Sequence, residues 1–385
     1  MYKIKTINKI SPEGLALFTD EYEVGDDLTD ENGILVRSAD LHDYDMPESL
    51  LAIARAGAGV NNIPIEECTK KGIAVFNTPG ANANAVKELV ICSLFLSSRK
   101  IVEGNEWVKN LETDDFSKAV EAGKKQFVGP EINDKKLGVI GLGAIGVAVA
   151  NAATKLGMTV YGYDPYMSVS AAWGLSKWVR HAASAEEIFK ECDYITLHVP
   201  ATEETNGMIN AKAIKQMPTG VRILNFARGS LVNTEDMIDA LRKGQVAKYV
   251  TDFGTKELAH TENCIVLPHL GASTPESENN CADMAVREMM DYLKNGNITN
   301  SVNMPSVSAP RGHAYRICVF HENKPNMLAT FATAFGQENL NIEHMMNKAR
   351  GSYAYTMIGT EEITDTIRET IENCDGVIKC RVFGR

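Results

Sequence analysis

Short apolar runs alternate with amphipathic segments along almost the whole chain, and this alternation constrains the fold more than any other feature. Strands that alternate with helices form parallel sheets joined by crossover helices. Two series of candidate strands predict two doubly wound α/β domains. The expected strands are Tyr2–Ile7, Gly33–Arg37, Leu51–Ala56 and Ile73–Asn77 in the first series, and Leu137–Gly141, Thr159–Tyr163, Ile195–Val199, Val221–Phe226, Lys248–Phe253 and Ile265–Pro268 in the second.

Two long helical stretches and a C-terminal unit complete the predicted organisation. One helix is expected at roughly 85–110, and another from Pro275 to Asn295, with Thr274 as its N-cap and Gly296 as its stop. The segment 303–312 lacks periodicity and is predicted to be a linker. Residues 313–385 are expected to form a small α+β unit, with strands Arg316–Phe320, Ile342–Lys348, Ala354–Thr360 and Ile378–Val382 and helices Met327–Glu338 and Thr364–Cys374.

Composition argues against several classes of protein. The formal net charge of −11 disfavours a nucleic acid or an acidic membrane as the partner. The longest uncharged apolar run, Leu137–Ala153, contains four glycines and suits a strand, turn and helix better than a membrane span. The N-terminus lacks the apolar stretch of a signal peptide. Eight cysteines with no C-x-x-C pair and no zinc-type spacing predict reduced thiols, a cytoplasmic protein and no metal site.

A G-x-G-x-x-G sequence follows the apolar strand that begins at Leu137. Gly141 is expected to make the tight turn, Gly143 to let the backbone approach a pyrophosphate, and Gly146 to let helix and strand pack closely. The N-terminus of the following helix would supply amides to the phosphates. Asp164 ends the next strand and would bind the adenine ribose, where its charge would repel a 2′-phosphate. The motif therefore predicts NAD rather than NADP; the alternative is a glycine-rich turn without a ligand.

Three later segments place charged residues at the ends of predicted strands, where open α/β sheets bind their ligands. Oxidation of an alcohol needs a base near neutral pH, for which His269 is the candidate. Glu257 would orient that histidine and raise its pKa, and Arg228 could bind a carboxylate through two hydrogen bonds. Taken singly, each has another explanation: a surface ion pair for the arginine, packing for the histidine and a solvated loop for the glutamate.

Together these segments resemble those of the D-2-hydroxyacid dehydrogenase family. The arginine motif of the family is similar to Asn225–Asn233, its glutamate loop to Asp252–Glu257, and its histidine motif to Pro268–Thr274. The resemblance covers essentially the whole chain, because it extends to Arg55–Asn62, Val75–Pro79 and Glu88–Val90. Leu258 stands where the family usually has proline, and the stretch from Glu257 to His269 is shorter than in many relatives, which affects the expected shape of this loop.

The resemblance implies NAD-dependent oxidation of 3-phospho-D-glycerate to 3-phosphooxypyruvate, the first committed step of L-serine biosynthesis. It implies that His269 is the acid/base, that Arg228 binds the substrate carboxylate and that Glu257 tunes the histidine. The substrate domain would comprise residues 1–98 and 275–302, and the NAD-binding Rossmann domain residues 99–274, with the substrate between them. Cofactor contacts are expected at Gly141, Gly143, Ala144, Ile145, Gly146, Asp164, His198, Val199, Pro200, Thr205, Phe226, Ala227, Arg228, Asp252, His269 and Gly271. Substrate contacts are expected at Arg55, Ala58, Gly59 and Asn82, and Lys124 and Lys125 are weaker phosphate candidates that a solvated surface explains at least as well.

The C-terminal unit, residues 313–385, resembles an ACT domain in the segment His321–Leu328 and in Asn341-Ile342. The resemblance implies that two such modules pair and hold L-serine as an effector at His321, Asn323 and Asn341. It also implies a homodimer or homotetramer. Asn326 replaces the usual glycine, and asparagine tolerates the positive φ angle expected there. The alternative is a module that only dimerises.

Two other functions stay open. One is a D-2-hydroxyacid dehydrogenase that acts on hydroxypyruvate or D-lactate, against which the C-terminal module and Arg55 argue. The other is a non-enzymatic, NAD-sensing protein of the corepressor kind, against which the acidic net charge, the C-terminal module and the complete set of Arg228, Glu257 and His269 argue.

Overall fold

In the computed structural model, which describes residues 1–384, the chain forms two compact units. One comprises residues 1–82 with the chain from 278 onward, and the other residues 83–277. Parallel sheets with flanking helices confirm the predicted α/β class, and the C-terminal part confirms the α+β unit. Among the described residues, no helix is both long enough and apolar enough to cross a membrane.

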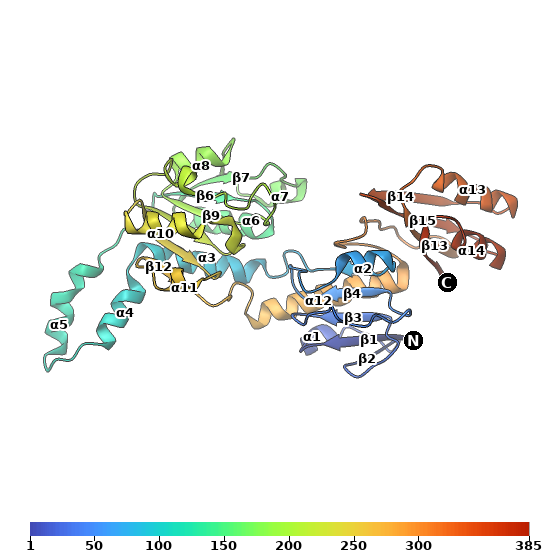
Figure 1. The fold of residues 1–385 in the computed structure, drawn as a ribbon, viewed down its shortest axis with the longest axis horizontal. Helices are drawn as coiled ribbons and strands as arrows, with labels where there is room; N and C mark the ends of the chain where they lie inside the picture. Colours follow the sequence, from blue (N-terminus) through green and yellow to red (C-terminus); the bar gives the residue numbers. More distant parts are fainter. Residues whose placement is uncertain (385) are drawn as a thin grey trace. The chain divides into compact units, whose positions relative to one another are not determined.

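The unit of residues 83–277 is built on a seven-stranded parallel sheet in the order β12-β11-β10-β9-β6-β7-β8 (Figure 1). Apolar side chains on both faces of the sheet form two cores, as expected for strands covered by helices on both sides. The strands are β6 (Lys136–Ile140), β7 (Thr159–Tyr163), β8 (Arg180–His181), β9 (Tyr194–Leu197), β10 (Val221–Asn225), β11 (Val246–Thr251) and β12 (Cys264–Val266). The helices around it are α3 (Ala83–Ser98), α6 (Ala144–Lys155), α7 (Val169–Gly174), α8 (Ala185–Glu191), α9 (Ala211–Ile214), α10 (Thr234–Arg242) and α11 (Lys256–Ala259), with a 3₁₀ turn η2 (Gly229–Leu231).

The predicted helix at 85–110 is wrong, because the structure has two helices there. Helix α3 ends at Ser98, and α4 begins at Ile101. The hydroxyl groups of Ser97 and Ser98 both donate to the Leu94 carbonyl, where they compete with the backbone and end the helix. Buried residues of α3, which the sequence analysis placed in the substrate domain, belong to a core of this unit. Helices α4 (Ile101–Lys109) and α5 (Phe116–Gly123) and the turn η1 (Lys124–Phe127) extend from the sheet as an arm (Figure 1).

The other unit contains a five-stranded parallel sheet in the order β2-β1-β3-β4-β5. Its core includes buried residues of α12 (Pro275–Asn295), whose predicted bounds and Thr274 cap are confirmed. The strands are β1 (Tyr2–Ile7), β2 (Tyr22–Gly25), β3 (Gly33–Val36), β4 (Ala52–Arg55) and β5 (Ala74–Phe76), and the short helices are α1 (Pro12–Leu15) and α2 (Ile65–Lys70).

The C-terminal module of the same unit is a four-stranded antiparallel sheet in the order β14-β15-β13-β16. Its strands are β13 (Tyr315–Glu322), β14 (His344–Arg350), β15 (Tyr353–Thr360) and β16 (Val377–Phe383). Helices α13 (Met327–Gln337) and α14 (Asp365–Glu372) cover one face of it (Figure 1).

The other face of this sheet packs against α12. The sequence analysis had predicted only a linker between the module and the rest of the chain, so this contact was not expected. Phe320 and Tyr355 share a core with Tyr292 and Leu293 of the helix. The guanidinium of Arg381 donates to the carbonyls of these two helix residues at 3.0 and 2.7 Å. Successive side chains of a strand point to opposite faces of the sheet. A strand with apolar side chains on both faces therefore needs another element packed against each face.

Candidate active site

The glycine motif forms a turn between β6 and α6 that leaves backbone amides free. Gly141 has a φ angle of +92°, which favours glycine. A Cβ atom on Gly146 would lie 1.9 Å from the Gly141 carbonyl oxygen, so only glycine allows this close approach. Gly143 faces open space and caps α6 without a side-chain hydrogen bond. The first amides of α6, those of Ala144, Ile145 and Gly146, therefore lack helical partners and can bind a pyrophosphate.

Asp164 lies directly after β7, next to this turn. Its carboxylate oxygens accept hydrogen bonds from the backbone N–H groups of Leu142 and Tyr166, both at 2.8 Å. These two bonds fix the carboxylate beside the glycine turn, and each oxygen keeps a lone pair that can accept a ribose hydroxyl. The glycine turn, the N-terminus of α6 without a side-chain cap and the fixed Asp164 carboxylate together fit a dinucleotide.

The loop after β9 carries His198, Val199 and Pro200. The His198 ring contacts the Thr196 hydroxyl at 3.0 Å through Nε2, while its Nδ1 atom is buried without a hydrogen bond. Burial lowers the pKa of this histidine to about 3, so the ring is neutral near pH 7. The Thr205 hydroxyl donates to the Pro200 carbonyl at 2.6 Å and closes the loop.

Asp252 organises the carboxyl ends of β11 and β12. It is buried, and one carboxylate oxygen accepts the Gly271 N–H at 3.0 Å, which holds the loop that carries His269. The other oxygen is buried without a partner. Burial raises the pKa of Asp252, and the Gly271 N–H and the nearby charges of His269 and Arg228 oppose that rise. One buried carboxylate thus lies within electrostatic reach of both the predicted base and the predicted carboxylate-binding arginine.

His269 and Arg228 are exposed, so both side chains can reach a ligand. The centroid of the His269 ring lies 4.7 Å from that of the Phe253 ring. The sequence analysis did not predict this contact, although the sequence shows an aromatic residue directly after Asp252. Asn225 at the end of β10 holds the arginine loop by donating to the Arg228 carbonyl at 2.8 Å. Phe226 is buried, and Ala227 accepts from the Arg228 side chain through its carbonyl.

The structure does not bring Glu257 to His269. Among residues 1–384, no hydrogen bond or ion pair joins the two side chains. Glu257 is exposed in the first turn of α11, where the N–H of its own residue and then the Thr255 hydroxyl lower its pKa. Leu258, the departure from the family pattern, is buried in the core and donates its N–H to the Thr255 hydroxyl, which a proline could not do.

The predicted substrate residues lie in the other unit. The Arg55 side chain folds over the following loop and donates to the carbonyls of Arg37 and Gly59. Ala58 is exposed, and Asn82 has a buried side-chain oxygen without a hydrogen bond. The weaker candidates Lys124 and Lys125 lie in η1 of the arm, where Lys124 pairs with Glu121 at an exposed position, in agreement with the solvated explanation.

The predicted effector residues lie at opposite ends of the C-terminal sheet within one chain. His321 is buried, with its ring bonded to the Glu322 carbonyl and the Thr356 hydroxyl, and burial lowers its pKa. Asn323 is exposed next to it, by the turn between β14 and β15. Asn341 is exposed at the other end, next to Thr360. Asn326 has a φ angle of +69°, which confirms that asparagine preserves this turn.

A parallel Rossmann sheet, a glycine turn and a set of charged residues at its strand ends define a dinucleotide-binding α/β protein. Residues 91–271 match the family model "D-isomer specific 2-hydroxyacid dehydrogenase, NAD binding domain". The chain belongs to the D-isomer-specific 2-hydroxyacid dehydrogenase family, and the predicted NAD-binding domain is confirmed.

Named relatives and a solved structure support this membership. The chain is 30% identical over 349 residues to D-3-phosphoglycerate dehydrogenase from Haemophilus influenzae, covering 87% of this chain and 81% of the relative. It is 35% identical over 294 residues to the human protein of that name, covering 74% of this chain and 52% of the relative. The chain therefore spans about half the length of several curated relatives. A crystal structure of NAD⁺-bound 3-phosphoglycerate dehydrogenase from Entamoeba histolytica has a TM-score of 0.62 and 28% identity, covering 78% of this chain and 98% of the other.

Proposed function

We propose that the chain oxidises 3-phospho-D-glycerate to 3-phosphooxypyruvate with NAD, the first committed step of L-serine biosynthesis. The observation that carries the proposal is the group of Arg228, Asp252 and His269 at the carboxyl ends of β10, β11 and β12, on the sheet that also holds the glycine turn. The names of the relatives at 30–36% identity support the choice of substrate.

Each residue has a role that its chemistry supports. The exposed His269 accepts the proton of the substrate hydroxyl, and Arg228 binds the substrate carboxylate and polarises the forming carbonyl. NAD, held by the glycine turn, the first amides of α6 and Asp164, would supply the hydride acceptor for this oxidation. Arg55 and the amides near Gly59 bind the anionic groups of the substrate, with Ala58 and Asn82 beside them. Glu257 pairs with His269 only after substrate binds, since catalytic hydrogen bonds often form only in the complex.

Initial rates with a panel of substrates test this proposal. NADH formation with 3-phospho-D-glycerate, well above that with D-lactate, is expected. A higher rate with D-lactate, or with hydroxypyruvate and NADH in the reverse direction, would indicate another dehydrogenase of the family. NAD binding without turnover of any of these acids would favour a corepressor-like sensor.

L-serine acts as the effector of a paired C-terminal module. Strand β14 is an edge strand with four exposed residues at its end, and an edge strand can pair with a second copy. Antiparallel pairing of two β14 strands would bring Asn341 of one copy toward Asn323 of the other, which supports a site shared by two chains. Asn323→Ala should weaken serine binding in calorimetry, with Asn373→Ala, directly after α14, as the control. No heat of binding and unchanged rates with serine would leave a module that only dimerises.

A homodimer or homotetramer is further supported by the arm of α4 and α5. Ile101, Val102, Phe116 and Val128 expose 51%, 43%, 47% and 75% of their surface, and exposed apolar side chains gathered on one segment mark interaction surfaces. The eight free cysteines support a cytoplasmic location, where thiols stay reduced. Analytical ultracentrifugation of the whole protein tests the assembly, and a monomer at micromolar concentration would contradict it.

A further inference from the structure

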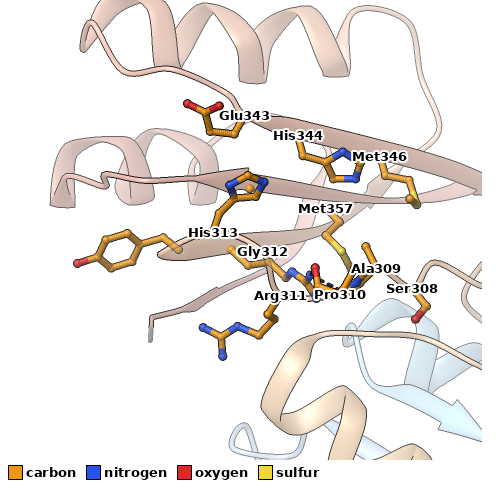
Figure 2. A pocket seen from close by; sticks show the side chains of 13 residues that line it. Ser308, Ala309, Pro310, Arg311, Gly312, His313, Glu343, His344, Met346 and Met357 are labelled. Atoms are coloured by element: carbon orange, nitrogen blue, oxygen red, sulfur yellow. Dashed lines mark hydrogen bonds between the residues drawn. The ribbon is translucent and has the colours of Figure 1, made fainter.

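The C-terminal module contains a cavity that lies apart from the predicted serine residues and has no part in the proposed reaction. It has a volume of about 400 Å³ and lies between the segment Ser308–Arg316 and strands β14 and β15. Figure 2 shows Met346 and Met357 projecting from the sheet toward this segment. A volume of this size falls in the range of small-molecule sites.

The floor of the cavity is apolar. Met346 and Met357 are register partners on β14 and β15, on the same face of the sheet that packs against α12. Next to them, Gly359 lies under the ring of His313, since a Cβ atom at this position would lie 2.6 Å from His313 Cδ2. Thioether side chains adapt to apolar groups of different shapes. The floor therefore suits a ring or a short chain of carbon atoms.

Two arginines, Arg311 and Arg316, are among the residues that line the cavity. Arg316 is buried and donates to the carbonyls of Asn295, Ala309 and Pro310 and to the Asn297 side chain. Arg311 donates to the Gly384 carbonyl. Burial lowers the pKa of Arg316, and the nearby charge of Arg311 lowers it further. Within residues 1–384, no carboxylate forms a hydrogen bond or ion pair with either guanidinium. Two such cations attract an anion.

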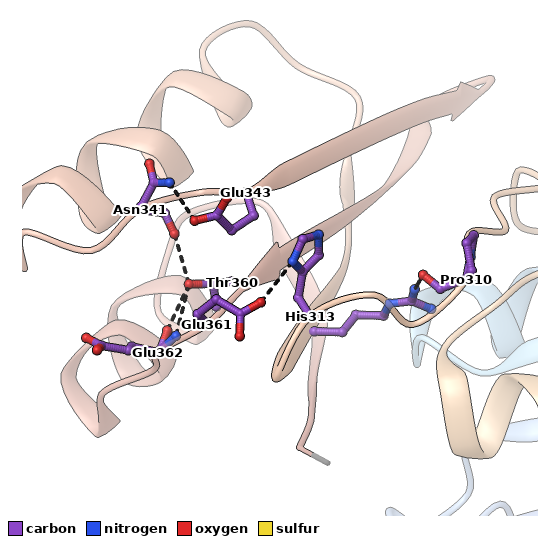
Figure 3. Close-up of polar contacts among 8 residues, drawn as sticks. Pro310, His313, Asn341, Glu343, Thr360, Glu361 and Glu362 are labelled. Carbon is purple, nitrogen blue, oxygen red and sulfur yellow. Dashed lines mark hydrogen bonds and ion pairs between the residues drawn. The ribbon is translucent and has the colours of Figure 1, made fainter.

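Glu343 on the cavity rim and Glu361 next to His313 both have partners within the module. Figure 3 shows the Glu361 carboxylate against the His313 ring, at 3.0 Å, and the Glu343 carboxylate against the Asn341 amide, at 2.7 Å. His344 adds a further imidazole to the rim (Figure 2). Each of these two carboxylates is therefore already hydrogen-bonded within the module.

We propose that this cavity is a second ligand site, which binds a small organic carboxylate with an apolar ring or chain. The carboxylate lies by Arg311, whose five N–H donors include several without an acceptor among residues 1–384, and the apolar part lies on Met346 and Met357. The proposal does not depend on the activity of the enzyme.

The probe is benzoate, with benzyl alcohol as its neutral counterpart and inorganic phosphate as an anion without an apolar part. Whole protein labelled with ¹³C at the methionine methyl groups reports the site directly, and Met346→Leu and Met357→Leu assign the two signals. Benzoate should shift both signals in a saturable way, and the other two compounds should not. Equal shifts with benzyl alcohol, shifts with phosphate alone, or no saturable shift would each overturn the proposal.

Variants test the role of the guanidinium. Arg311→Gln should weaken benzoate binding at least about fivefold, and Arg311→Lys should restore part of it. Arg368→Gln is the matched control, because Arg368 lies on α14 of the same module and pairs with Glu372. Unchanged affinity in a folded Arg311→Gln protein would contradict the site. If that variant does not fold, the comparison of benzoate with benzyl alcohol on the unaltered protein decides.

Discussion

At the scale of single residues, the buried carboxylate of Asp252 distinguishes this site from a set of surface charges. Its hydrogen bond to Gly271 links the end of β11 to the loop of His269. The sequence placed Asp252 beside the cofactor but could not show this bond, because it joins residues that only the folded sheet brings together. The predicted partner of His269, Glu257, stays a prediction that depends on the bound state.

The pairing of Glu257 with His269 can be tested through the pH dependence of the rate. A carboxylate near an imidazolium raises the pKa of the histidine, so Glu257→Gln should lower the apparent pKa of the base. Because oxidation needs the neutral imidazole, the rising limb of kcat/KM should then move to lower pH. An unchanged profile, with Lys256→Gln as the control in the same short helix, would exclude the pairing.

Cofactor choice rests on Asp164. Its charge beside the glycine turn should repel a 2′-phosphate, so the protein should prefer NAD strongly over NADP. Asp164→Ala should reduce the ratio of kcat/KM for the two cofactors by about tenfold or more. A wild-type protein that uses NADP as fast as NAD would contradict this role.

At the scale of elements, local signals predicted α12 fully because its cap, its first-turn proline and its terminal glycine all agree. Strands β2 and β8 were not predicted, since β8 consists of two exposed residues and β2 has only two apolar residues among acidic neighbours. The break between α3 and α4 was missed because the Ser97 and Ser98 hydroxyls, rather than a proline or glycine, end the helix.

The turn before α6 allows a matched pair of glycine variants. Gly143→Ala has room for its Cβ and an ordinary φ angle of −72°, so the free energy of unfolding should change by less than about 0.5 kcal/mol. NADH binding should weaken, because the methyl group would stand where the backbone approaches the pyrophosphate. Gly146→Ala should destabilise the protein by about 2 kcal/mol or more, since its Cβ would overlap the Gly141 carbonyl. Chemical denaturation and NADH fluorescence measure both effects, and equal stability losses would contradict this assignment.

Helix α12 contains a buried carboxyl group that makes stability depend on pH. Burial raises the pKa of Glu288 from 4.5 to about 7; one of its oxygens accepts from Asn300 at 2.6 Å, and the other is buried without a partner. The folded protein therefore holds this proton more tightly than the unfolded chain, so the contribution to stability is present below pH 4.5 and is lost as the pH rises through about 7.

Glu288→Gln should remove this loss. Between about pH 5 and pH 8, the free energy of unfolding of the variant should fall less than that of the wild type, by up to about 3 kcal/mol. Urea denaturation at both pH values measures the difference. Glu276→Gln, at an exposed position of α12, is the control, and equal pH dependence of Glu288→Gln and wild type would contradict the buried site.

At the scale of the whole molecule, strand alternation predicted the two parallel sheets and the C-terminal α+β module. It did not predict that this module shares a core with α12, because the apolar residues on both faces of β13 and β15 do not reveal which element covers each face. Backbone carbonyls at the end of α12 are bonded by Arg381, Arg316 and Tyr355 of the module. These contacts join the candidate effector module to helix α12 through a packed interface.

The proposed function requires His269 to act as the base in NAD-dependent oxidation of 3-phospho-D-glycerate. The most direct test is the initial rate of NADH formation from this acid by the wild type, by His269→Ala and by His260→Ala, whose exposed histidine lies directly after α11. The wild type should form NADH, His269→Ala should lose about 10²–10⁴-fold in kcat while still binding NADH, and His260→Ala should keep the wild-type rate. A wild type that forms no NADH from 3-phospho-D-glycerate, or a His269→Ala protein as fast as the wild type, would contradict the account.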